Sequence, residues 1–113
     1  MQNAQSVSTE ILRQLGGKRF LLMTGSSNLL FAGITESNDK VWLRMNLKRN
    51  KAGANRLKVY YNSDDTYTMR FYKQTISKKT LDVKITKEQV FDKVYNDQLQ
   101  SIFTDVTGLY TRL

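Results

Sequence analysis

The chain comprises 113 residues, of which 40% are hydrophobic and 25% charged, values typical of one soluble globular domain rather than a disordered chain. It contains no Cys and no His, which excludes a disulfide framework, a thiolate metal site and every Ser-His or Cys-His nucleophile arrangement. Its net charge of +8 favours an anionic partner.

Other signals that the sequence lacks narrow the function classes further. No apolar run approaches the roughly 18 residues that a membrane span requires. Residues 1–10 have neither the basic nor the apolar region of a secretory signal, and no phosphate-binding, dinucleotide-binding or metalloprotease motif is present. We therefore predict one cytoplasmic domain over residues 1–113, with residues 1–5 disordered. We expect that the protein is not an enzyme, that it uses no metal or cofactor, and that it does not bind a membrane.

The first third of the chain predicts one helix and two strands. Residues 6–15 carry an apolar stripe with helical spacing that ends at Gly16. Residues 19–25 are a short apolar run that ends in a glycine, which we interpret as a buried strand. A further strand is expected over residues 28–37.

The middle of the chain carries three segments in which apolar and polar residues alternate. They cover residues 41–48, 56–61 and 67–72. A period of two is the pattern of a half-buried antiparallel strand. The second and third segments flank an Asn-Ser-Asp-Asp turn, which predicts a hairpin. A weaker strand is expected over residues 81–85.

The last segment predicts a helix. Four apolar residues between Leu99 and Val106 have the i, i+3, i+4, i+7 spacing of an amphipathic helix, and Gly108 would end it. An earlier helix start at Thr86, with a capping box, is the alternative. Together the segments predict an α+β fold: an antiparallel meander of about five or six strands with a short N-terminal helix and a C-terminal helix.

The positive charge is concentrated in one part of the chain. From Lys40 to Leu81 there are eleven basic and two acidic residues, a net charge of +9, whereas the remaining residues carry seven basic and eight acidic, a net charge of −1. Segregation of the charge indicates a directed anionic partner rather than general solubility.

The alternation of the three middle segments predicts which side chains point away from the core. They are Trp42, Arg44, Asn46 and Lys48 of the first, Arg56, Lys58 and Tyr60 of the second, and Thr68, Arg70 and Tyr72 of the third. If these strands are neighbours, one face shows three aromatic rings among five cations and no carboxylate. Cations follow phosphates and flat rings stack on bases, so this combination is typical of single-stranded nucleic-acid binding.

The sequence therefore predicts a nucleic-acid-binding protein of low sequence specificity that prefers single strands. Its candidate binding residues are Trp42, Arg44, Lys48, Arg49, Lys51, Arg56, Lys58, Tyr60, Arg70 and Tyr72. The three aromatic residues among them would stack on bases and the seven cations would hold phosphates. The loop that begins at Lys48 is either a flexible basic arm or merely solvated.

Three alternatives remain open. The C-terminal helix could cover this same face, which would make the three aromatic side chains the rim of the core. We expect it instead on the opposite face, which is wholly apolar around Leu43. The basic face could also dock on an acidic protein partner. Finally, an exposed strand could pair with a second copy in a homo-oligomeric scaffold subunit.

Several short blocks resemble the pattern of a family of small proteins from bacteriophages and mobile elements. The blocks are Leu15–Gly17, Arg19-Phe20, Met23–Gly25, Asp65–Tyr67 and Thr107–Leu109. Their order along the chain, from about residue 15 to the end, carries the resemblance. The family has no established activity or site residues, so the resemblance implies no catalytic residue. A phage or mobile-element origin favours DNA metabolism or antagonism of a host protein.

Overall fold

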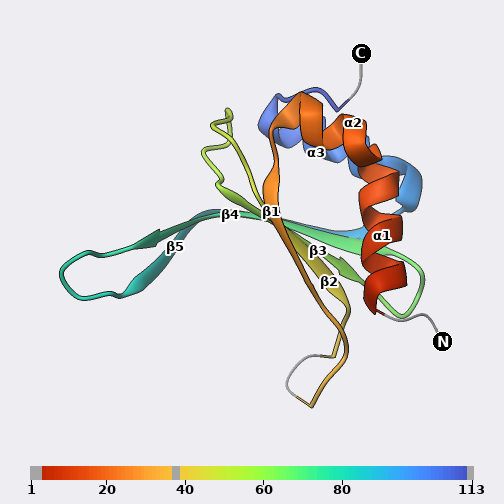
Figure 1. Ribbon diagram of the computed structural model, residues 1–113, viewed down its shortest axis with the longest axis horizontal. Helices are drawn as coiled ribbons and strands as arrows, with labels where there is room; N and C mark the ends of the chain where they lie inside the picture. Colours follow the sequence, from red (N-terminus) through yellow and green to blue (C-terminus); the bar gives the residue numbers. More distant parts are fainter. Residues whose placement is uncertain (1–3, 37–38, 112–113) are drawn as a thin grey trace.

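The structure is a computed structural model that describes residues 4–36 and 39–111 (Figure 1). Its elements are α1 (Ala4–Leu15), α2 (Gly17–Thr24), β1 (Ser27–Ala32), β2 (Trp42–Asn46), β3 (Arg56–Tyr61), β4 (Tyr67–Ile76), β5 (Val83–Val94), a 3-10 turn (Asn96–Gln98) and α3 (Leu99–Thr107). The five strands form one antiparallel sheet in the order β1-β2-β3-β4-β5. The predicted α+β meander with helices at both ends of the chain is confirmed.

One hydrophobic core lies between the helices and one side of the sheet. The helices contribute Val7, Ile11, Leu15, Phe20, Leu99 and Phe103, and the middle strands contribute Leu43, Met45, Leu57, Val59, Met69 and Phe71. The ring of Phe103 packs edge-on against Phe20 at a centroid distance of 4.9 Å. The helices therefore cover the wholly apolar face, as expected, and no helix of the described residues lies on the opposite side of the sheet (Figure 1).

The predicted strand over residues 19–25 is wrong, because this segment forms α2. Gly16 and Gly17 both have positive φ, which turns the chain sharply out of α1. The segment then buries Phe20 and Thr24, one helical turn apart, while Leu22 between them is exposed. A strand would have buried Leu22 with them, so the short apolar run was ambiguous until its neighbours were known.

The other disagreements lie at the ends of the chain. Ala4 and Gln5 belong to α1, so disorder is not found there, while residues 1–3 lie outside the described residues. The alternative helix start at Thr86 is wrong, because β5 continues through this residue to Val94. β5 is longer than the predicted strand over residues 81–85, and its alternation shifts at a bulge where Lys87 has positive φ.

The last part of β4 and the first part of β5 form a two-stranded arm that extends away from the body (Figure 1). β3 pairs with β4 only as far as Tyr72, so residues 73–86, here called the arm, pair only with each other. The tip is closed by hydrogen bonds from the Ser77 amide to the Asp82 carbonyl and from the Leu81 amide to the Ser77 carbonyl. Such a ribbon exposes both of its sides to solvent.

The β3–β4 hairpin turns through the predicted Asn-Ser-Asp-Asp segment. The Asp64 carboxylate accepts hydrogen bonds from the amide and the hydroxyl of Thr66. The Tyr61 hydroxyl donates a hydrogen bond to Asp65. Tyr61, which the alternation of β3 places on the core side, is half-buried and packs against the edge of the core.

We expect the Tyr61 hydroxyl to lose its proton at a higher pH than an ordinary tyrosine does. The hydrogen bond to Asp65, burial and the negative charge of that carboxylate raise the pKa of Tyr61 to about 12. The stabilisation linked to neutral Tyr61 is therefore complete below about pH 10, the unfolded value, and is lost as the pH rises through about 12. Burial also raises the pKa of Tyr67, so absorbance titration should show a smaller step at high pH in Tyr61→Phe than in the wild type. An unchanged late step in the variant would contradict the assignment.

Candidate nucleic-acid interface

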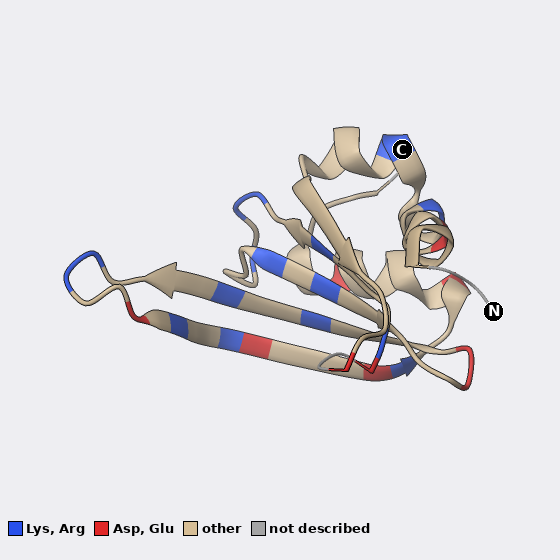
Figure 2. Ribbon diagram, turned by 60° about the horizontal axis from the view of Figure 1, so that its bottom comes forward, with Lys and Arg blue, Asp and Glu red and all other residues tan. Residues whose placement is uncertain are grey.

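The side of the sheet that faces away from the helices, here called the open face, carries its side chains in three rows across β2, β3 and β4. Strand pairing aligns Trp42 with Tyr60 and Thr68, Arg44 with Lys58 and Arg70, and Asn46 with Arg56 and Tyr72. Figure 2 shows basic residues along these strands and at the tip of the arm, with the helices on the other side of the sheet. The three strands are therefore neighbours, as the prediction required, and the side chains aligned in these rows share one face of the sheet.

The central row places three cations side by side. Arg44 is directly opposite Lys58, and Lys58 is directly opposite Arg70. Neighbouring strands lie about 4.8 Å apart, and like charges in such cross-strand pairs destabilise a sheet. Among the described residues, Arg44 and Lys58 form no ion pair with a carboxylate. A bound polyanion would remove this repulsion.

The third cation of the row is neutralised within the protein. Arg70 forms an ion pair with Glu88 of β5, with an Nε–Oε2 distance of 2.5 Å. Burial opposes the charge of Arg70, but contacts with Glu88 and Tyr60 together outweigh it, so the pKa of Arg70 lies above its ordinary value. The predicted role of Arg70 in phosphate binding therefore competes with this ion pair.

The open face also holds carboxylates, contrary to the prediction. Glu88 pairs with Arg70, and Asp92 accepts a hydrogen bond from the Thr68 hydroxyl at 2.9 Å. Both residues belong to the part of β5 that the sequence pattern did not identify as strand. They form an acidic border along the β5 side, so the unneutralised cations lie towards β2 and β3.

Two of the predicted stacking residues lie together beneath one ammonium group. The Lys58 Nζ is 4.3 Å from the ring centroid of Trp42 and 5.1 Å from that of Tyr60. Both rings are half-buried, so part of each remains accessible to a ligand. Trp42, Lys58 and Tyr60 therefore form one compact cation–aromatic group, here called the stacking group.

Tyr72 does not belong to the stacking group. It lies on the predicted face, but only 4% of its surface is exposed. The Arg70 guanidinium covers its ring, with 4.4 Å between Cζ and the ring centroid. The prediction that Tyr72 stacks on a base is therefore wrong, because the ring is already packed within the sheet.

The structure separates the basic loop from the open face. Lys48 lies beyond the end of β2, and its alkyl chain passes so close to Gly25 that a Cβ there would lie 2.4 Å from Lys48 Cδ. Lys51 lies near Gly108, at the end of α3 on the helix side of the sheet. Arg49 is exposed between them. Of the ten predicted binding residues, these three belong to a different surface.

The loop is internally hydrogen-bonded. The Asn50 side chain donates to the carbonyls of Lys48 and Ala54 at 2.8 and 2.7 Å and accepts from the Ala52 amide at 3.1 Å. The Lys51 amide donates to the Thr107 carbonyl at 3.2 Å. These contacts fix the loop against α3, rather than leaving it as the flexible arm that its Gly and Ala residues indicate.

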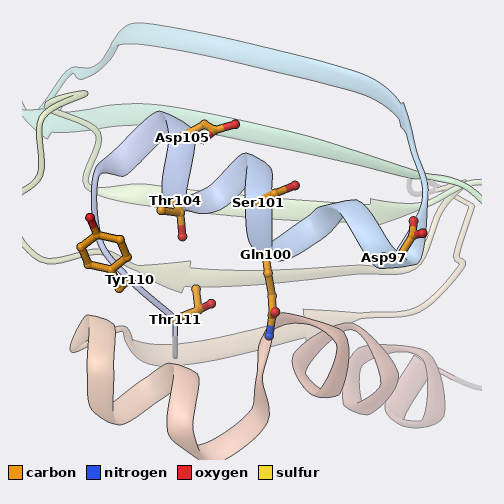
Figure 3. Close-up of a pocket in the computed structure, with 7 residues that line it drawn as sticks. All are labelled: Asp97, Gln100, Ser101, Thr104, Asp105, Tyr110 and Thr111. Carbon is orange, nitrogen blue, oxygen red and sulfur yellow. The ribbon is translucent and has the colours of Figure 1, made fainter. Parts of the chain in front are cut away.

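A cavity of the described residues lies elsewhere, beside α3. It has a volume of about 500 Å³ and is lined by Asp97, Gln100, Ser101, Thr104, Asp105, Tyr110 and Thr111 (Figure 3). Its two carboxylates and its lack of Lys or Arg make it unsuited to a polyanion. It contains none of the predicted binding residues, so it does not contribute to the interface.

Comparisons with known proteins add no assignment: no protein-family model, curated protein or solved structure matches the chain. Within residues 4–36 and 39–111, no helix is long and apolar enough to cross a membrane. The same ranges hold no group of three Asp or Glu side chains placed to bind a metal ion.

Proposed function

We propose that the protein is a non-enzymatic nucleic-acid-binding protein that holds single strands on its open face. The observation that carries the proposal is the central row, in which Arg44 and Lys58 lie side by side without a carboxylate partner among the described residues. Arg56 lies one row away. These cations would hold phosphates, while Trp42 and Tyr60 would stack on bases.

Stacking on these two rings requires Lys58 to move. A cation–aromatic contact at an exposed site contributes about 0.5–1 kcal/mol, whereas a base stacked on an aromatic side chain contributes about 1–3 kcal/mol. Exchange of the Lys58 ammonium for a base is therefore favourable. The released ammonium is then close enough to the base to bind the adjoining phosphate. In the free protein, Lys58 covers the rings and limits their exposure to water.

Salt dependence tests the proposal. Neutralisation of one phosphate on a single strand by each of the three cations Arg44, Arg56 and Lys58 predicts that log K falls with log salt at a slope of about −2. Fluorescence anisotropy of a labelled single-stranded oligonucleotide at several salt concentrations measures this slope. Affinity that does not change with salt would reject the proposal. Capture of an acidic protein that survives nuclease treatment and requires Arg56 and Lys58 would instead favour the protein-docking alternative.

A second candidate function, a self-associating scaffold subunit, is favoured by the β1 edge of the sheet. Residues 20–35 contain no charged side chain, although 25% of the whole chain is charged. This segment supplies β1, one of the two edge strands, and exposes Leu30, Phe31 and Ile34. The β5 edge is instead rich in charged residues. Edge strands are normally protected from pairing by charged side chains. Because the β1 edge carries no charged side chain, it favours pairing with a second copy of the chain.

We expect Leu30→Lys to prevent this pairing. Leu30 is 49% exposed, and a lysine there would place two like charges together at a symmetric β1–β1 contact. Ile85→Lys is the matched control, since Ile85 is 46% exposed but lies on the arm. Light scattering should show a dimer for the wild type and for Ile85→Lys, and a monomer for Leu30→Lys. A monomeric wild type would exclude this candidate.

A further inference from the structure

The arm has two chemically different sides. Cross-strand pairing aligns Lys73 with Thr86 and Thr75 with Lys84 on one side, and Gln74 with Ile85 and Ile76 with Val83 on the other. The tip adds Lys78 and Lys79, both exposed. Residues 73–87 contain five lysines and one carboxylate, Asp82, which gives a net charge of +4. The arm is thus a narrow basic ribbon with one side of Lys and Thr.

The basic loop is attached to the base of this arm. The Asn55 amide donates to the Tyr72 carbonyl at 3.0 Å, and the Asn55 side chain bonds both the amide and the carbonyl of Gln74, at 2.8 and 2.9 Å. Lys87 lies against the loop, where a Cβ on Gly53 would be 2.9 Å from Lys87 Cδ. The backbone of the basic loop is therefore anchored to the base of the arm and in contact with Lys87, while the side chains of Lys48 and Lys51 lie against Gly25 and Gly108.

The two basic surfaces differ in one important respect. The open face combines cations with accessible aromatic rings, whereas residues 73–90 contain no aromatic side chain. A surface without rings binds phosphates but offers nothing on which an unpaired base can stack. In a duplex the bases are already paired and stacked, so phosphate contacts suffice. A two-stranded ribbon also has the width that the major groove, about 12 Å across, admits.

We propose that the arm, together with the basic loop at its base, binds duplex nucleic acid, so that the protein recognises the junction between a duplex and a single strand. Lys78 and Lys79 hold phosphates at the tip, and the side that carries Lys73 and Lys84 enters the groove. The inference rests on the proposed function for the single-stranded half of the junction. The inference that the duplex half of the junction is bound depends only on the charge and shape of the arm.

The test compares three probes made from one labelled DNA oligonucleotide: the single strand, the blunt duplex with its full complement, and the tailed duplex with a half-length complement. We expect the tailed duplex to bind tightest. Lys78→Ala/Lys79→Ala should remove that preference and make the salt slope of tailed-duplex binding shallower by about 2, because two duplex phosphate contacts are lost. Lys18→Ala/Arg19→Ala is the matched control, since it removes two adjacent exposed cations from α2. It should leave the preference unchanged.

The outcomes separate this inference from the proposed function. Equal affinity of the wild type for the single strand and the tailed duplex would overturn the role of the arm while leaving single-strand binding intact. Equal losses in the arm variant and the control variant would also overturn it. Tight binding of blunt and tailed duplexes alike, without binding of the single strand, would support the arm as a duplex site and reject both the open-face function and the junction.

Discussion

Trp42→Ala and Tyr60→Ala are each expected to weaken binding of single-stranded DNA by about 5- to 150-fold. This range corresponds to the loss of about 1–3 kcal/mol of stacking per base. Both rings lie in the stacking group beneath Lys58, so each variant removes one stacking surface without removing a charge. Fluorescence anisotropy at fixed salt measures the change in Kd for single-stranded and duplex probes.

Tyr110→Ala is the matched control for these two variants. Tyr110 is an exposed tyrosine that lines the cavity beside α3, away from the open face. Its replacement should leave the Kd unchanged. Tyr72→Phe provides a second comparison, because a buried ring that cannot stack should tolerate the loss of its hydroxyl group without a change in affinity. Equal losses on single-stranded and duplex probes would show that Trp42 and Tyr60 do not stack on unpaired bases.

Phe103→Ala is expected to destabilise the fold by about 3–5 kcal/mol, the usual cost of emptying a fully buried aromatic site. Phe103 is completely buried and lies between Phe20 of α2 and Phe71 of β4, at ring-centroid distances of 4.9 and 6.2 Å. It therefore links both helical ends of the chain to the sheet. Denaturation in urea, followed by circular dichroism, measures the free energy of unfolding.

The control for the core variant is Leu22→Ala. Leu22 is an exposed residue of α2, and surface substitutions of this kind usually change the free energy of unfolding by less than about 0.5 kcal/mol. A loss at Phe103 as small as that at Leu22 would contradict the packing of α3 and α2 on one core. Because a total stability of about 5–15 kcal/mol is normal, Phe103→Ala alone could unfold much of the protein.

The alternating strands of the sheet could be predicted residue by residue. Leu57 and Val59 are buried while Lys58 and Tyr60 are on the other side, because successive side chains of a strand point to opposite faces. The same rule identified the open face before the order of the strands was known. Likewise, the helical spacing from Leu99 and the glycine stop at Gly108 predicted α3 correctly.

Features that depend on distant partners could not be predicted in this way. Tyr72 follows the same alternation as Tyr60, yet it is buried, because the strand neighbours and Arg70 close over it. The ion pair between Arg70 and Glu88 needs β5 beside β4, whereas the sequence predicted a strand only over residues 81–85, and the capping-box pattern at Thr86 offered a helix start as the alternative. Local patterns record which side of an element is apolar, but they contain no information on what lies across it.

The stretch of cations from Lys48 to Lys58 shows which properties the sequence determines and which the tertiary structure decides. Its composition alone makes it basic and uncompensated by acidic residues, a property that depends only on which residues are present. The tertiary structure divides it between two surfaces, because β3 places Arg56 and Lys58 on the open face whereas Asn50 and Asn55 bind the loop to its own backbone and to the arm. Hydrogen bonds between residues 19 positions apart decide where these charges lie, and no local pattern specifies such bonds.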